Sequence, residues 1–572
     1  MSEHAGARLR AWGPDLWVAL LVAVLTFPMW IARGGGLARD LIFTPDRPWT
    51  LDTIGMGGAA PRAVPLDSFL SLTTGLLGGE VVFRLCVAGV LLAAGLGAVR
   101  AVADLPPAAR AVPGTFAVWN PFVVERVAMG QWALLSAYAA LFWLVPRWRQ
   151  LLSGGGGWSG TALATVAAAL TPTGAVIVLG TCLTTVAVSR PRHQAGRLVL
   201  LALAVQLPWL TPSLLGGHAA TSDPAAVEAF AARGGSTGVA VALAAGGGIW
   251  NPFATPGSMQ GWYAVVVAMA CVTALVVGLR RWWRDYPGLV VAAAGGLVLA
   301  SAASLPGGAT ALAWAVAHVP GAGLLRDGQK WAMPFVVLLS LSWGVLAARV
   351  LERARKTDAA PIAVACLALA PVVAVPDGAA TTWDALRPVR YPAELAAVIG
   401  TLDAAPEDSG AVVSLPWASY RRYPWGLDVS AADPVSRWTS RPAIVSDALV
   451  TQGGELTAED PRARAVAAVL AGPESRLDQG LAELGVGWVS VLHGTDPQLD
   501  ERTASAVARL DVVSRGETVS LYRVSGSPHR GPAPSAARVA LVVAAHLLWA
   551  MLGVAALVTG ISRRLNRRNR EM

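Results

Sequence analysis

The sequence predicts an α-helical polytopic membrane protein that carries one small extracytoplasmic α/β domain. Apolar residues make up 54% of the 572 residues and charged residues only 14%, and the mean hydropathy is +0.52. Such values are typical of integral membrane proteins. Long apolar runs recur along the chain, and nearly every second gap between them holds a cluster of arginines. One long polar block, residues 377–536, interrupts this alternation.

The arginine clusters predict which connections face the cytoplasm, because basic loops near membrane segments are retained on that side. Before the basic terminal run ISRRLNRRNR, the clusters are Arg8 and Arg10; Arg100 and Arg110; Arg147 and Arg149; Arg190, Arg192 and Arg197; Arg280, Arg281 and Arg284; and Arg353, Arg355 and Lys356. We therefore expect a multi-pass protein of the cytoplasmic membrane with both termini in the cytoplasm.

The apolar runs predict about twelve spans, since a helix needs about 20 apolar residues to cross a bilayer. The clear runs are 15–32, 83–99, 128–146, 197–215, 261–279, 287–304, 331–350, 360–376 and 537–561. Three further spans, 111–125, 158–171 and 174–189, follow from the charge pattern, because two stretches with basic clusters at both ends must each cross twice. A basic cytoplasmic tail, 562–572, completes the chain.

Three regions are then expected to face outward: the loops 33–82 and 216–260 and the polar block 377–536. The first loop contains a predicted interfacial helix that starts at an Asp67 or Ser68 cap. The polar block alternates between predicted amphipathic helices and short buried strands, as a small α/β domain would. Its predicted helices are 391–405 and 461–472, its strands are 410–417, 442–447 and 485–494, and its hairpin is 511–524. It contains no GxxxxGK[ST] or GxGxxG phosphate-binding motif.

The charge distribution argues against a nucleic-acid partner, although the net charge is +9. Residues 381–533 hold 14 Arg and 19 Asp or Glu, a balance of −5, so the remainder carries +14. Most of that excess lies in the short inward loops, where topology and anionic membrane lipids explain it. The four cysteines all fall inside apolar runs, which is not the pattern of a disulfide framework or a zinc site.

Polar side chains gather at the predicted outer ends of the spans, whereas no span carries a carboxylate at its midpoint. The missing midpoint acids argue against an ion-coupled transporter. The outer groups are Asp40, Asp46 and Asp67 with Arg39, Arg47 and Arg62 in the first loop; Glu125, Arg126 and Gln131 at one turn; and Arg326, Asp327 and Lys330 before another span. They can converge if their spans pack together.

Such a pocket suits a lipid that bears a phosphate and a sugar. Arginine forks bind phosphate, and a carboxylate can take the proton of an attacking hydroxyl. Nucleotide sugars are cytoplasmic, so chemistry on the outer face needs a donor that crosses with the membrane. A polyprenyl-phosphate-linked sugar is the expected donor class, and a cell-envelope glycan or lipid is the expected acceptor.

At this point the chain resembles the GT-C superfamily of integral membrane glycosyltransferases, especially uncharacterised actinobacterial members. The likeness rests on a short first helix followed by a long loop with an acid, Asp40, on the interfacial helix, on the many spans and on the α/β domain. The segments LARDLIFTPDRPW and PRAVPLD look like the first-loop signature, and VWNPFVVERVAMGQWALL looks like the hairpin of the third and fourth spans.

The resemblance implies that Asp40 is the general base for the acceptor hydroxyl, sometimes with a divalent metal such as Mg or Mn. Asp40 follows Arg39 rather than a second acid, which departs from the commoner pattern of the family. Arg126, Arg326 and Lys330 would hold the donor phosphate. Further candidates for substrate or metal binding are Asp46, Asp67, Glu125, Asp327 and Trp250.

Each candidate has a structural alternative. Asp40 could pair with Arg39 or Arg47, and Glu125 could pair with Arg126 at a tight turn. Asp67 could cap a helix, and the group before the tenth span could act as interfacial anchors, namely Arg326, Asp327 and Lys330. The motif WNPF occurs at 119–122 and 250–253, and a proline-capped turn explains it better than an aromatic platform for a sugar. For the whole protein, the alternatives are a transporter or flippase of lipid-linked glycans and a non-enzymatic scaffold for envelope assembly.

Overall fold

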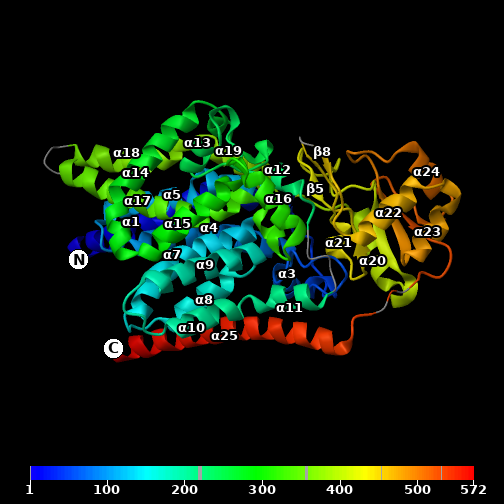
Figure 1. The fold of residues 1–572 in the computed structure, drawn as a ribbon, viewed down its shortest axis with the longest axis horizontal. Helices are drawn as coiled ribbons and strands as arrows, with labels where there is room; N and C mark the ends of the chain where they lie inside the picture. Colours follow the sequence, from blue (N-terminus) through cyan, green and yellow to red (C-terminus); the bar gives the residue numbers. More distant parts are fainter. Residues whose placement is uncertain are drawn as a thin grey trace.

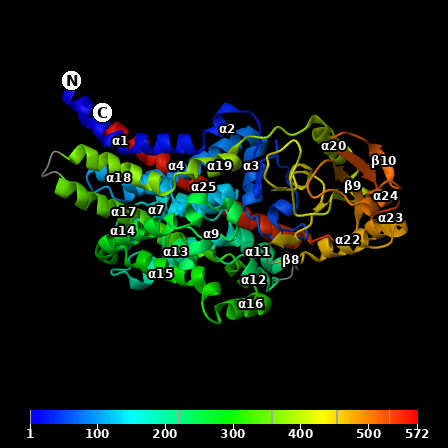
Figure 2. The same cartoon turned by 90° about the horizontal axis from the view of Figure 1, so that it is seen from above.

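The computed structural model describes residues 2–216, 222–354, 359–451, 454–529, 531 and 533–571. It consists of a large helical domain with an α/β domain at one end (Figure 1). Both ends of the chain lie at the far end of the helical domain, away from the α/β domain (Figures 1 and 2). The two ends of the chain and the α/β domain therefore lie at opposite ends of the molecule (Figures 1 and 2).

Helices of very different lengths form the helical domain. They are α1 (Ser2–Leu25), α2 (Pro28–Ile31), α3 (Leu66–Leu77), α4 (Gly79–Ala101), α5 (Pro107–Val118), α6 (Pro121–Ala128), α7 (Trp132–Leu152), α8 (Trp158–Ala168), α9 (Pro172–Val188), α10 (Ala195–Ala204), α11 (Leu207–Leu215), α12 (Ala226–Ala229), α13 (Val239–Ala244), α14 (Tyr263–Asp285), α15 (Pro287–Ser301), α16 (Gly308–His318), α17 (Met333–Ala354), α18 (Ala360–Ala374), α19 (Gly378–Leu386) and α25 (Ala536–Glu571).

Within the described residues, five helical stretches are long and apolar enough to cross a membrane. They are Gly79–Ala101, Tyr263–Asp285, Pro287–Ser304, Gly328–Ala354 and Ala536–Asn566. Two bent pairs, α10 with α11 (52°) and Ile362–Ala374 with α19 (54°), raise the number to seven if each pair is one span. The sequence-based count of about twelve depends on shorter helices as well, and it stays a prediction.

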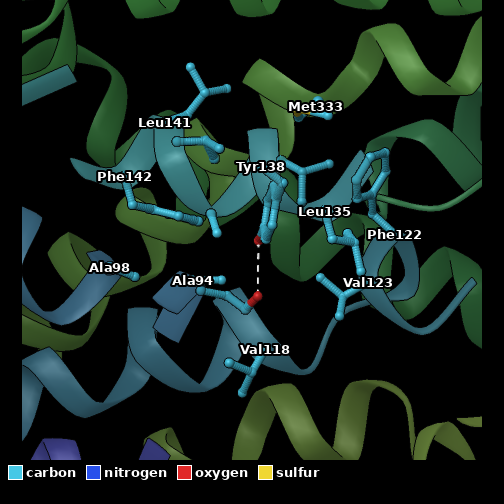
Figure 3. Close-up of a cluster of buried hydrophobic side chains, with 14 of the residues drawn as sticks. Ala94, Ala98, Val118, Phe122, Val123, Leu135, Tyr138, Leu141, Phe142 and Met333 are labelled. Atoms are coloured by element: carbon cyan, nitrogen blue, oxygen red, sulfur yellow. Dashed lines mark hydrogen bonds between the residues drawn. The ribbon is translucent and has the colours of Figure 1, made fainter. Parts of the chain in front are cut away.

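The core of the helical domain lies where α7 and α17 are buried by their neighbours. Both helices are apolar on nearly every side, as expected of elements without a lipid-facing or water-facing stripe. Tyr138 lies inside this core among Phe122, Leu135 and Phe142 (Figure 3). Its hydroxyl donates to the carbonyl of Ala117 over 3.1 Å, so the buried polar group is paired.

The helix α6 begins at the first WNPF motif because Asn120 caps it. The Asn120 side chain accepts the backbone N–H of Val123 (3.0 Å), and Pro121 occupies the first helical position, where a missing N–H costs nothing. The second motif repeats this device, since Asn251 accepts the N–H of Phe253 (3.0 Å) at the 3₁₀ helix η3 (Pro252–Ala254). Both copies are therefore capped turns.

The α/β domain is built on one mixed sheet of five strands in the order β10-β11-β9-β3-β6. Strand β3 pairs in parallel with β6 and β9, while β11 is antiparallel to β9 and β10. The elements are α20 (Ala393–Ala404), β3 (Ala411–Leu415), β4 (Tyr420–Arg421), β5 (Ala431–Ala432), α21 (Val435–Trp438), β6 (Ala443–Ile444), β7 (Leu449–Thr451), β8 (Gly454–Leu456), α22 (Pro461–Ala471), α23 (Leu477–Glu483), β9 (Val486–Leu492), α24 (Glu501–Val507), β10 (Asp511–Ser514) and β11 (Val519–Arg523). Each helix and strand predicted for this block has a counterpart here.

Two helical boundaries differ from the sequence-based expectation. The helix α3 begins at Leu66, so Asp67 lies in its first turn instead of capping it. The helix α19, placed by sequence in the polar block, packs on α1 and α6, and its Trp383 indole donates to the Val24 carbonyl (2.7 Å). Residues 378–386 therefore belong to the helical domain.

Candidate functional site

The first loop presents Asp40 at the tip of a small hairpin. Strand β1 (Leu37–Ala38) pairs with β2 (Leu41–Ile42), and Arg39 and Asp40 form the two-residue connection. Arg39 has a φ of 51°, a left-handed conformation that tight hairpin turns require. The Asp40 side chain at this tip is exposed.

The turn between α6 and α7 lies directly against this hairpin. Gly130 has a φ of 81°, and a Cβ there would lie 2.2 Å from the Leu41 backbone nitrogen. Only glycine permits this approach. It brings Gln131 beside Asp40, and the Asp40 N–H donates to the Met129 carbonyl (3.2 Å).

The Asp40 carboxylate accepts one side-chain hydrogen bond on each oxygen. Gln131 Nε2 donates to Oδ2 (2.9 Å), and the Tyr420 hydroxyl of the α/β domain donates to Oδ1 (2.5 Å). Burial, and then the nearby Asp40 carboxylate, raise the pKa of Tyr420 well above its usual value. The hydroxyl is therefore protonated and acts as the donor.

Asp40 makes no ion pair among the described residues. Arg39 instead donates to the carbonyls of Ala128 (2.6 Å) and Phe253 (2.9 Å), and Arg47 pairs with Asp67 (3.0 Å). Both alternative partners considered for Asp40 are thus engaged elsewhere, so its charge faces solvent and two neutral donors.

Behind Gln131 lies a buried polar network centred on Arg126, whose side chain is fully buried. The guanidinium makes two 3.0 Å bonds to the two oxygens of Asp327, one 2.6 Å bond to Gln131 Oε1, and a further bond to Gln329 Oε1. Because Gln131 accepts from Arg126 through its oxygen, its amide nitrogen must point to Asp40. Arg126 therefore sets the orientation of the group that holds Asp40.

Glu125, also fully buried, ties a third loop to the network. Its carboxylate accepts the N–H groups of Gly248 (3.1 Å) and Ile249 (3.2 Å) and the Gln329 amide (2.7 Å). Glu125 and Arg126 therefore meet through Gln329, whereas the sequence considered a direct pair between them. Gln329 lies in the 3₁₀ helix η7 (Gly328–Ala332), which precedes α17.

The segment formed by η7 and the residues just before it supplies two further cations. Lys330 Nζ lies 3.1 Å from Asp327 Oδ2, and Arg326 lies 2.5 Å from Glu459 of the α/β domain. Burial tends to raise the pKa of Asp327, but Arg126 and Lys330 lower it more, so the net pKa lies well below the usual value. Arg62 reaches the same Glu459 carboxylate. Lys330 and Arg326 keep part of their surface exposed.

The donor set around Asp40 does not fit a divalent cation. Asp40 is a single carboxylate, because the other acids of its network, Glu125 and Asp327, are buried and engaged by their own hydrogen-bond donors. The part of the chain that the structure describes contains no group of three or more His, Cys, Asp or Glu side chains suited to a metal.

Solved structures show which known fold this architecture shares. No protein-family model matches the sequence, and no curated protein matches it. The arabinofuranosyltransferase AftD from Mycobacteria superimposes with a TM-score of 0.55 at 18% identity, over 91% of this chain and 40% of AftD. A mutant form of AftD gives 0.53 at 16% identity, over 90% of this chain and 42% of that one. The chain therefore shares the fold of AftD.

The likeness covers most of this chain but only part of AftD. The chain spans less than half the length of AftD. ArnT from Cupriavidus metallidurans, in the apo state, matches 90% of this chain and 98% of its own at 13% identity, with a TM-score of 0.39. The fold assignment therefore rests on the superposition with AftD. At 18% identity, that superposition shows a shared architecture and no more.

The three outer polar groups that the sequence predicts to converge do meet, at one end of the helical domain. Asp40, Gln131, Arg126, Asp327 and Lys330 form one chain of contacts. Arg126 differs from the sequence-based expectation of a phosphate ligand, because it is buried and its terminal nitrogens are occupied. Of the three predicted phosphate ligands, Arg326 and Lys330 retain exposed surface.

Three other candidates lie outside this chain of contacts. Asp67 is buried and binds Arg47 (3.0 Å) and Arg437 (2.6 Å), which joins the first loop to the α/β domain. Asp46 is exposed, and its carbonyl accepts from Thr44. Trp250 packs edge-on against Phe230 (4.9 Å between centroids), so the indole is half-buried in its own loop instead of forming a free platform.

Sequence reasoning missed Tyr420, Gln329 and Glu459. Tyr420 lies 380 positions from its partner Asp40, and nothing in its local pattern marks it. Gln329 lies between Asp327 and Lys330. Both of those neighbours were predicted as site residues, but Gln329 itself was not. Glu459 resembles the many surface acids of the polar block.

Proposed function

We propose that this protein is a membrane glycosyltransferase that moves a sugar from a polyprenyl-phosphate donor to a cell-envelope glycan or lipid on the outer face of the cytoplasmic membrane. The observation that carries the proposal is Asp40: an exposed carboxylate, held by Gln131 over a buried network, in a chain with the GT-C fold. AftD is named as an arabinofuranosyltransferase, which makes arabinofuranose the first sugar to test.

In this proposal Asp40 is the general base of an inverting transfer. The acceptor hydroxyl donates its proton to Asp40 while its oxygen attacks the anomeric carbon, and the polyprenyl phosphate leaves. Lys330 and Arg326 would meet the phosphate, because both are cationic and partly exposed. Arg126 would act through Gln131 by holding the base in place.

The test uses the purified full chain in lipid nanodiscs. Synthetic polyprenyl-phosphate sugars, including the arabinofuranosyl form, serve as donors, oligosaccharides serve as acceptors, and mass spectrometry detects the product. We expect Asp40→Asn to lower the rate by about 10²–10⁴-fold, the usual contribution of a general base. The thermal unfolding temperature should stay close to that of the wild type, since Asp40 is exposed.

The matched control is Asp428→Asn. Asp428 is an exposed acid whose side chain pairs with Arg422 at the surface, so its loss should leave transfer unchanged. In cells, a strain that carries Asp40→Asn should lose the glycan that the wild type adds. Normal envelope glycans in that strain would exclude the transferase and favour a scaffold or a flippase.

A further inference from the structure

The α/β domain contributes a side chain to the candidate catalytic centre. Tyr420 stands on strand β4, and its hydroxyl donates to Asp40 Oδ1, whereas Gln131 of the helical domain donates to Oδ2. Each oxygen of the carboxylate thus has one donor, and the two donors come from different domains. Such a pair of contacts fixes the rotation of the carboxylate as well as its position.

These two contacts leave the carboxylate able to react. An ionised carboxylate has about four acceptor positions, so one position on each oxygen stays open to an incoming hydroxyl. Asp40 also remains exposed to solvent. The geometry therefore orients the base without blocking it.

Backbone hydrogen bonds between β4, β5 and the first loop hold Tyr420 in register with Asp40. Strand β4 pairs with β5, Tyr420 opposite Ala432. Strand β5 pairs in turn with the first loop: the Arg39 N–H donates to the Ser430 carbonyl (2.8 Å), and the Ala432 N–H donates to the Arg39 carbonyl (3.1 Å). One ladder thus connects the residue before Asp40 to the strand that carries Tyr420.

The residue after Tyr420 anchors the same strand from behind. Arg421 is buried, and its guanidinium donates to the carbonyls of Pro416 (2.7 Å) and Ser414 (2.8 Å). Strand β4 therefore has little freedom to move away from the first loop.

We propose that Tyr420 is a positioning residue for Asp40, so that the α/β domain completes the active centre. The inference rests on the proposed function for its catalytic meaning. A donor on Oδ1 stabilises the charged form of the carboxylate and keeps one of its open positions aimed at the acceptor.

The experiment compares Tyr420→Phe with Tyr423→Phe in the full chain in nanodiscs. Tyr423 is a buried tyrosine of the same segment whose hydroxyl donates to the Ala432 carbonyl (3.3 Å), so Tyr423→Phe reports any general damage to the ladder. The first readout needs no substrate. Infrared difference spectra against Asp40→Asn isolate the carboxylate band of Asp40 at a fixed pH.

In Tyr420→Phe we expect this band to change frequency, because the carboxylate loses one of its two hydrogen-bond donors. In Tyr423→Phe the band should not move. With the arabinofuranosyl donor, Tyr420→Phe should lower kcat about 10-fold.

A fluorinated tyrosine at position 420 keeps the ring and the hydroxyl but makes the hydroxyl a stronger donor. It should move the band in the direction opposite to Tyr420→Phe, and it decides the matter if Tyr420→Phe does not fold. A band that stays at the wild-type frequency with both replacements overturns the inference. If instead Asp40→Asn transfers sugar as fast as the wild type while the band shifts, the contact with Tyr420 stands and Asp40 is not the general base. If the wild type transfers no sugar while the band shifts, the contact stands and the proposed transferase fails.

Discussion

At the residue scale, the most consequential group is the buried ion pair of Arg126 and Asp327. Burial of two charges costs several kcal/mol per ion, and their attraction offsets that cost only when the geometry is good and the remaining donors are paired. Here the pair has two 3.0 Å bonds, and Gln131, Gln329 and Lys330 add further partners, while Nε of Arg126 is left without a hydrogen bond among the described residues. The pair therefore works as a fixed support for Gln131.

We expect Asp327→Asn to destabilise the protein by about 3–5 kcal/mol, because it leaves the buried Arg126 charge without its counter-ion. Thermal unfolding followed by tryptophan fluorescence would measure the effect. Asp428→Asn, which breaks an exposed pair with Arg422, should cost less than about 1 kcal/mol. Equal effects of the two changes would mean that the Arg126 pair is not the support described here.

At the element scale, the two WNPF motifs show how one local signal serves two environments. The first caps α6 inside the core, where Asn120 also donates to the Phe116 carbonyl (2.6 Å) and to the Tyr138 hydroxyl (3.2 Å). The second caps η3 in a loop, where Asn251 is only half-buried. Loss of the asparagine cap should therefore destabilise the protein more at the first motif than at the second.

We expect Asn120→Ala to destabilise the protein by about 2–4 kcal/mol, the sum of a lost cap and an unpaired buried acceptor. Asn251→Ala should cost about 1 kcal/mol, close to a cap alone. The two unfolding temperatures, measured in the same detergent, test the difference. An equal loss in both would show that burial of Asn120 adds nothing.

Local pattern predicted the elements well and their long-range contacts poorly. The strands β3, β6 and β9 and the hairpin of β10 and β11 follow from alternation and turn residues, which act over a few positions. The convergence around Asp40 follows from basic loops that orient neighbouring spans. The partner of Asp40 could not be found in this way, because Tyr420 becomes its neighbour only through the pairing of β5 with Arg39.

At the scale of the whole molecule, charged contacts join the two domains at the end that carries Asp40. Arg62 and Arg326 share Glu459, and Arg62 also reaches Asp447 (3.4 Å). The hairpin of β7 and β8 packs its Leu449 and Leu456 against α12. These contacts flank the ladder that holds Tyr420, so the docking of the domains and the shape of the site depend on each other.

We expect Glu459→Gln to loosen this docking, because two arginines lose their shared carboxylate. Hydrogen exchange should become about 5- to 10-fold faster in α12 and at Leu456–Ala458. Glu474→Gln, which breaks a pair with Arg509 inside the α/β domain, should leave both segments unchanged. Unchanged exchange with Glu459→Gln would show that apolar packing alone holds the domains together.

The long helix α25 has a consequence for biosynthesis. It packs along α8 and α11, and its Trp549 indole donates to the Val166 carbonyl (3.2 Å), a residue 383 positions earlier. At about 5–20 residues per second, the ribosome needs on the order of 20–80 s to travel from one to the other. Throughout that interval the apolar side chains of Val166, Ala169 and Val205 lack the Trp549 side chain that packs against them in the finished structure. Completion of the helical domain must therefore wait until the α/β domain has been synthesised.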